Sequence, residues 1–152
     1  MVRKASARYK DYRIGLDWDG ETGAGVNIDN RHELKVDMPK GFGGKGRFPC
    51  PHELLFSSFG GCILVTYLRM ARDMNLDLKG LKVCVNGRVD WIDYSITDVE
   101  VTISPEISED EVWEADECAR LTEKYCPIRR ELAPAFSVKI VTEVRIRKES
   151  PS

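Results

Sequence analysis

Residues 51–75 have the sequence PHELLFSSFGGCILVTYLRMARDMN, and this stretch decides the fold. Its apolar side chains fall on nearly every face of a helix until Arg69 and Arg72 mark a solvated end. A helix that is apolar all round is typical of a buried core. Pro51 suits the first helical turn, and Glu53 suits the positive end of the helix dipole. We therefore predict a buried helix from residue 51 to about residue 75.

Three strands and a loop are predicted on the N-terminal side of this helix. Tyr, Ile, Leu and Trp are interspersed with charged residues over residues 8–18, which favours a strand that Gly20 ends. Residues 22–29 and 32–38 flank Asp29-Asn30-Arg31, a pattern typical of a hairpin turn. Residues 39–51 hold four glycines and three prolines and therefore predict a loop without regular structure.

Strands and a second helix are predicted on the C-terminal side. Two stretches after the central helix alternate apolar and polar residues, as half-buried antiparallel strands do. Ser108 and Glu111 form a capping box that begins a second helix, and Cys126-Pro127 interrupts that helix. The two strands are predicted over residues 80–93 and 96–104, a short helix over 128–132 and a last strand over 136–147. This element order predicts an α+β fold with largely antiparallel sheets.

Composition restricts the class of protein. The chain has 152 residues and 17.3 kDa, with 23 basic and 25 acidic side chains, which predicts one globular domain over residues 1–152 with its core at about 8–147. A net charge of -2 offers no basic field for nucleic acid or acidic membranes. The uncharged run 54–68 is 15 residues long and rich in small residues, too short for a membrane span. The first 13 residues hold no apolar signal segment, so a cytoplasmic location is expected.

Five cysteines without a Cys-x-x-Cys pair are expected to be free thiols in a reducing compartment. Cys84 lies on a predicted strand and Cys118 on the second helix, and both patterns favour structural packing. Cys62 lies inside the central helix, where a small buried hydrophobe and a reactive thiol are both compatible with its position. Its role stays open on position alone.

Cys126 differs from the other cysteines because it precedes a proline at a helix break. A new helix begins there, and its N-terminal dipole favours a thiolate. Arg129 and Arg130 follow three and four residues later and add positive charge. A purely structural contact at the end of the second helix remains the alternative. Cys62 and Cys126 are 64 residues apart, so the spacing alone does not pair them.

Metal and nucleotide sites are not predicted. Cys50, His52 and His32 do not complete a ligand set, because the chain has only two histidines and no closely spaced cysteine pair. The glycines of residues 41–46 are not followed by Gly-Lys-Ser or Gly-Lys-Thr, so they do not form a phosphate-binding loop. We expect no metal and no cofactor.

Two motifs together resemble a known family. A glycine-rich loop leads into Pro51-His52-Glu53-Leu54-Leu55, Gly60-Gly61-Cys62 follows inside the helix, and Cys126-Pro127-Ile128 ends the second helix. This combination resembles the OsmC/Ohr family of osmotically inducible and organic hydroperoxide resistance proteins. The resemblance covers residues 8–147 and includes the element order. The Pro-x-Glu-Leu form is closer to an OsmC-like branch than to the typical hydroperoxide reductases.

The resemblance implies a fold, an assembly and an activity. It implies an intertwined α+β homodimer with two sites at the subunit interface and thiol-dependent reduction of organic hydroperoxides. Cys62 would be the cysteine that attacks the peroxide, and Cys126 would resolve the product as a disulfide. A small dithiol would then restore both thiols, and no cofactor is implied.

The sequence departs from the peroxidase pattern beside the first cysteine. Those enzymes carry a glutamate ten residues before it, paired with an arginine, whereas His52 occupies that position here and Glu53 comes nine before. Arg13, Arg31 and Arg47 are candidate cations for the thiolate. We take Glu53, His52 and Arg47 as the neighbours that support the site. The alternatives are an OsmC-like protein that binds a small molecule or responds to redox state without efficient peroxidase activity, and a chain whose thiols are inert.

Overall fold

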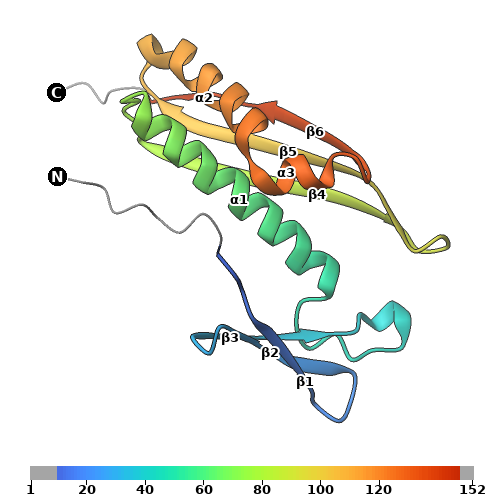
Figure 1. Cartoon of the computed structure of the whole chain (residues 1–152). Helices are drawn as coiled ribbons and strands as arrows, with labels where there is room; N and C mark the ends of the chain where they lie inside the picture. The colour runs from blue at the N-terminus through green and yellow to red at the C-terminus, as the bar shows by residue number, and fades with distance from the viewer. Residues whose placement is uncertain (1–9, 148–152) are drawn as a thin grey trace. The chain divides into compact units, whose positions relative to one another are not determined.

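A computed structural model gives the structure of residues 10–147. The chain divides after Leu54 into two compact units, and the boundary falls inside the long helix α1 (Pro51–Asp73). The N-terminal unit is a three-stranded antiparallel sheet in the order β1-β2-β3 (Figure 1). Its strands are β1 (Ile14–Trp18), β2 (Gly23–Ile28) and β3 (His32–Asp37). All three expected strands are present, although β1 starts later than residue 8 and residues 8–9 lie outside the described part.

The register of this sheet gives it one apolar face. Leu16 pairs with Val26, and Val26 pairs with Leu34, so these side chains share a face. The side chains of β1 on that face are exposed: Ile14 by 51%, Leu16 by 62% and Trp18 by 75%. Three short strands with an uncovered apolar face are not stable by themselves. The sheet therefore needs a partner surface.

The predicted turn of the hairpin and the loop after it are both in place. Asp29 and Asn30 have φ values of 52° and 55°, the left-handed conformation that a two-residue hairpin turn requires. The loop is not free of regular structure as expected, since Lys40–Phe42 form one turn of 3-10 helix. That turn ends at Gly43, whose φ of 81° only glycine adopts readily.

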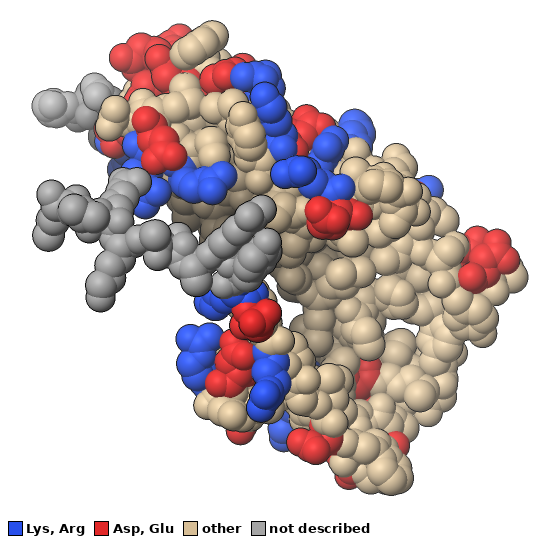
Figure 2. Space-filling view, in the orientation of Figure 1, with Lys and Arg blue, Asp and Glu red and all other residues tan. Residues whose placement is uncertain are grey.

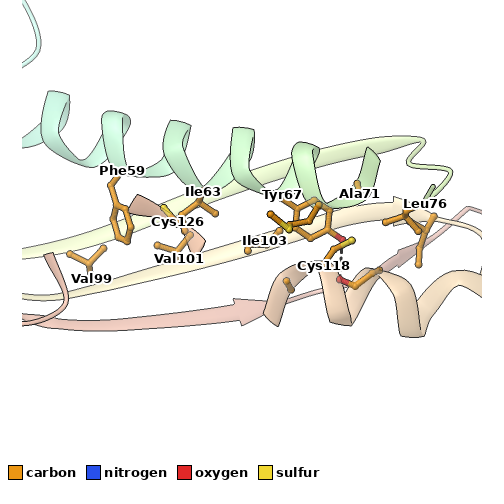
Figure 3. Packing of buried hydrophobic residues seen from close by; sticks show 14 residues of the cluster. Phe59, Ile63, Tyr67, Ala71, Leu76, Val99, Val101, Ile103, Cys118 and Cys126 are labelled. Atoms are coloured by element: carbon orange, nitrogen blue, oxygen red, sulfur yellow. Dashed lines mark hydrogen bonds between the residues drawn. The ribbon is translucent and has the colours of Figure 1, made fainter. Parts of the chain in front are cut away.

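Helix α1 packs through one face only. Figure 3 shows Phe59, Ile63 and Tyr67 on the side of α1 that faces strand β5 (Ser95–Ile107), and all three are fully buried. Val65 and the side chain of Leu68 are exposed on the other side. The expectation of a helix buried all round is therefore wrong for this chain, because the sheet covers a single face.

The length expected for this segment was also too short. Helix α1 has 23 residues, and its most apolar 18-residue window has a mean hydropathy of 1.5, so by length and composition alone it is able to cross a membrane. Core helices pass the same test, and this helix contributes its buried face to the hydrophobic core of its unit. We interpret α1 as a core helix.

The C-terminal unit is built on a second sheet. Strand β4 (Gly80–Asp90) pairs antiparallel with β5, as expected. The last predicted strand is two strands, β6 (Ser137–Thr142) and β7 (Arg145–Ile146), and both run parallel to β5. The parallel direction follows from the connection, because the chain leaves β5, crosses over through helices and returns on the same side.

Two helices make that crossover. The capping box is present, with the Ser108 N–H donating to the Glu111 carboxylate at 3.4 Å, but the first turn is 3-10 helix (Glu109–Glu111). Helix α2 (Val112–Tyr125) follows and packs beside α1, where the Tyr67 hydroxyl donates to the carbonyl of Ala115 at 3.1 Å. Helix α3 (Pro127–Leu132) begins at the predicted break.

Two glycines allow α1 to lie close to β4. A Cβ atom at Gly87 would stand 2.2 Å from the ring of Phe56 on α1, and one at Gly60 would stand 2.8 Å from a methyl group of Val85. The expectation that another backbone approaches the glycines of the central helix is correct for Gly60, where the neighbour is a β4 side chain. Gly61 points away into open space. Surface charges are mixed, since basic and acidic side chains are interspersed on the face shown in Figure 2.

Candidate functional site

The first cysteine of the candidate site is placed by the core helix. Cys62 lies in the third turn of α1, one residue before the fully buried Ile63. Its own side chain is partly buried. A helix that packs by one face fixes the direction of each side chain on it, so Cys62 is held at the margin of the core. It is the more accessible member of the pair described next.

The second cysteine is placed by a proline. Pro127 disfavours a helical conformation in the residue before it, and Cys126 is accordingly extended, with φ of -66° and ψ of 117°. Its N–H still donates to the carbonyl of Thr122 in α2 at 2.9 Å, and its own carbonyl accepts from the N–H of Arg130 in α3 at 3.1 Å. Cys126 thus belongs to both helices, and both of them fix its backbone.

The structure brings these two sulfur atoms together. The Cys126 Sγ lies 3.3 Å from the Cys62 Sγ, although the residues are 64 positions apart in the chain. Cys126 is fully buried, and Figure 3 shows it beneath α1 close to Ile63. A disulfide needs about 2.05 Å between sulfurs, so the pair is reduced and close to bonding distance.

Burial sets the state of the Cys126 thiol. Removal from water raises the pKa of Cys126 to about 11, and the neighbouring Cys62 acts in the same direction. The backbone N–H groups of Arg129 and Ile128 oppose this and lower the pKa, without making a side-chain cap of full hydrogen-bond geometry. At neutral pH Cys126 is therefore a protonated thiol beside a more accessible sulfur.

An ion pair spans the break that carries Cys126. The Nη2 of Arg129 in α3 lies 2.6 Å from Oε1 of Glu123 in α2. The sequence analysis noted Arg129 only as positive charge and did not identify Glu123 as its partner. Partners six residues apart fall outside the usual helical spacings, so no simple pattern in the sequence indicates the pair.

The other cysteines are not near this pair within the C-terminal unit. Cys118 is fully buried, its Sγ lies 3.5 Å from the Met74 sulfur, and burial raises its pKa to about 11. It precedes Cys126 by eight residues, which is about 12 Å of helix. Cys84 lies opposite Thr102 on β4 and is exposed, so it is a surface residue and not a core one.

Glu53 and Cys50 meet at the beginning of α1. The N–H of Cys50 donates to the Glu53 carboxylate at 2.7 Å, which is the contact of a glutamate in the first turn with the residue that caps the helix. Glu53 precedes Cys62 by nine residues and His52 by ten, about 13 and 15 Å along the helix axis. Within one chain these side chains do not reach Cys62 by helix geometry, and their supporting role stays a prediction.

Arg47 is held by three carboxylates of the N-terminal unit. Its guanidinium contacts Asp37 at 2.8 Å, Asp19 at 2.6 Å and Glu21 at 2.6 Å. Hydrogen bonds from Arg47, with a further one from Thr22, hold the pKa of the buried Asp37 carboxyl well below its usual range. These contacts tie the loop to β3, and they engage the donors that Arg47 would offer to a thiolate.

The two remaining candidate arginines lie near one turn. The backbone N–H of Arg13 donates to Asp29 at 2.8 Å, and the guanidinium of Arg31 lies 3.3 Å from the same carboxylate. Among residues 10–147, no group of three or more His, Cys, Asp or Glu side chains is placed to hold a metal ion. The sulfur pair is the arrangement in the described chain with redox chemistry.

Comparisons with known proteins agree with this geometry. The family model described as OsmC-like protein matches residues 44–141. No curated protein matches the chain. Among solved structures, an organic hydroperoxide resistance protein from Elizabethkingia anophelis has a TM-score of 0.72 at 19% identity, covering 93% of this chain and 100% of its own.

Two further solved structures have the same fold. An organic hydroperoxide resistance protein OsmC from Legionella pneumophila has a TM-score of 0.70 at 18% identity and covers 91% of this chain and 100% of its own. A hypothetical protein from Aquifex aeolicus has a TM-score of 0.76 at 18% identity and covers 92% and 100%. At these identities the likeness concerns the fold.

Proposed function

The chain belongs to the OsmC-like family, and on this premise we propose that it reduces organic hydroperoxides with Cys62 and Cys126. The observation that carries the proposal is the distance of 3.3 Å between their sulfur atoms. Relatives of this fold include proteins named for organic hydroperoxide resistance. The redox pair requires no cofactor, because the electrons come from the thiols.

The roles of the two cysteines follow from their exposure. The thiolate of Cys62, the more accessible sulfur, attacks the distal oxygen of the hydroperoxide; the O–O bond breaks and the alcohol leaves with a proton. Cys62 is then a sulfenic acid. The Cys126 sulfur attacks it, a disulfide forms, and the hydroxyl group leaves as water with the Cys126 proton. A dithiol from outside returns both cysteines to thiols by exchange and is itself oxidised to a disulfide.

The apolar surroundings of the pair favour organic peroxides. Phe59, Ile63 and Val101 are fully buried in the cluster that contains Cys126 and against which Cys62 packs. An alkyl or aryl group gains free energy when it leaves water for such surroundings, and hydrogen peroxide has no such group. We infer that cumene hydroperoxide and tert-butyl hydroperoxide are consumed faster than hydrogen peroxide.

The direct test is turnover in the presence of dithiothreitol. Cys62→Ser is expected to abolish consumption of cumene hydroperoxide, because no thiolate remains to attack it. Cys84→Ser is the matched control, since Cys84 is an exposed cysteine on the sheet and is expected to leave the rate unchanged. Equal rates in wild type and Cys62→Ser would remove the proposal. Unreacted thiols together with thermal stabilisation by an apolar ligand would favour the alternative of a small-molecule-binding protein.

We further propose that the working molecule is a homodimer in the cytoplasm. The support for a second copy is the apolar face of the β1–β3 sheet, which exposes Leu16 and Trp18. A soluble chain rarely leaves such a face uncovered. The support for the location is the set of free cysteines, which a reducing compartment maintains.

A further inference from the structure

The break between α2 and α3 carries the resolving cysteine and is bridged by a single pair of charges. Glu123 lies three residues before Cys126 and Arg129 three after it, and the contact of 2.6 Å joins the end of one helix to the start of the next. Among the described residues, this is the ion pair that connects α2 with α3. Its position makes the angle between the helices dependent on it.

The arginine of this pair is held at a cost. Its side chain is about one quarter exposed, and the Nε atom is buried without a hydrogen-bond partner in the described part of the chain. An unsatisfied buried donor lowers stability. Stability alone therefore does not explain this placement, whereas fixing the geometry of the break does.

We propose that the Glu123–Arg129 ion pair is a clamp that positions the Cys126 sulfur for attack on oxidised Cys62. Both residues are positioning residues, because they act through Cys126 and the backbone that carries it. The inference rests on the proposed function, since it concerns the second step of that reaction.

The clamp matters because the second step has a competitor. The sulfurs must shorten their separation from 3.3 Å to about 2.05 Å while the S–S bond forms and water leaves. If a second hydroperoxide molecule reaches the sulfenic acid first, it transfers an oxygen atom and leaves as the alcohol, and Cys62 becomes an irreversible sulfinic acid. A well-positioned Cys126 forms the disulfide first, so the proportion of sulfinic acid reports the position of Cys126.

The experiment measures this partition in four variants of the full chain. Cumene hydroperoxide is added in increasing excess without reductant, and mass spectrometry gives the ratio of Cys62 sulfinic acid to Cys62–Cys126 disulfide. Arg129→Gln and Glu123→Gln are expected to raise this ratio about tenfold, since a misplacement of about 1 Å in a reacting pair costs up to ~10²-fold in rate. Arg129→Lys keeps the charge and is expected to restore most of the wild-type ratio. Arg130→Gln is the matched control, because Arg130 is the adjacent, exposed arginine and is expected to behave as wild type.

The outcomes separate the clamp from the reaction it serves. A wild-type ratio in Glu123→Gln and Arg129→Gln, with disulfide still forming, would overturn the clamp and leave the proposed function intact. If Arg129→Gln does not fold, Glu123→Gln decides alone, because it removes the charge and preserves the side-chain size. An equal rise in Arg130→Gln would also overturn the clamp, because general loss of positive charge would explain it. Absence of any Cys62 oxidation in the wild type would instead remove the proposed function.

Discussion

At the scale of the residue, the chemistry depends on how Pro127 places Cys126. The proline forces the preceding residue out of helical geometry, and two backbone hydrogen bonds then fix that residue between α2 and α3. Burial keeps the Cys126 thiol protonated, whereas Cys62 is open to a substrate. The same pair of residue types with exchanged burial would exchange the two roles.

The raised pKa of Cys126, about 11, predicts a pH dependence of the second step. The attacking species is the thiolate, whose fraction grows about tenfold per pH unit while the pH lies below the pKa. Disulfide formation after one equivalent of hydroperoxide is therefore expected to accelerate from pH 6 to pH 9, measured by stopped-flow fluorescence. The Cys126→Ser variant supplies the control, since it should lack this phase. A rate independent of pH across this range would contradict a buried, protonated resolving thiol.

The sequence identified both cysteines but not the contacts of Arg47. A helix break before proline and a cysteine in an apolar helix are local signals, and the resemblance to a family paired them. The contacts of Arg47 with Asp19, Glu21 and Asp37 involve residues that are 10 to 28 positions away and lie on β3 or beside the β1–β2 turn. Such contacts follow from the register of a sheet, which charge pattern alone does not give.

At the scale of the element, the site depends on how closely α1 approaches β4. The ring of Phe56 occupies the space that a side chain at Gly87 would need. This approach sets the depth at which α1, and with it Cys62, lies on the sheet.

The substitution Gly87→Ala is expected to destabilise the protein by about 1–3 kcal/mol, because the new methyl group collides with the Phe56 ring. Urea denaturation gives this difference in the free energy of unfolding. Combination with Phe56→Leu is expected to cost less than the sum of the two single changes, because the smaller side chain makes room for the methyl group. Strict additivity of the two costs would show that these residues do not compete for space.

Hydrophobic periodicity predicted every strand and helix, but not the direction of the last pairing. The alternation over residues 136–147 does not reveal that β6 and β7 run parallel to β5, which depends on the crossover through α2 and α3. The apolar pattern of α1 likewise does not distinguish a helix covered on all sides from one covered by a single sheet. Both differences concern the partner of an element, which the element's own sequence does not contain.

At the scale of the whole molecule, the uncovered face of the N-terminal sheet predicts self-association. Leu16→Asp places a charge on that face and is expected to convert a dimer of 17.3 kDa chains into monomers, as measured by light scattering after size-exclusion chromatography. Asp17→Asn is the control, because the side chain of Asp17 lies on the opposite face of the same strand. A wild-type protein that elutes with the mass of one chain would exclude the homodimer.

The central claim is that Cys62 and Cys126 form one redox pair, and peptide mapping tests it most directly. One equivalent of cumene hydroperoxide is added without reductant, free thiols are alkylated, and the digest is analysed by mass spectrometry. We predict a disulfide between the Cys62 and Cys126 peptides, while Cys50, Cys84 and Cys118 stay alkylated. Five alkylated cysteines after this treatment, or a disulfide that joins any other pair, would contradict the account.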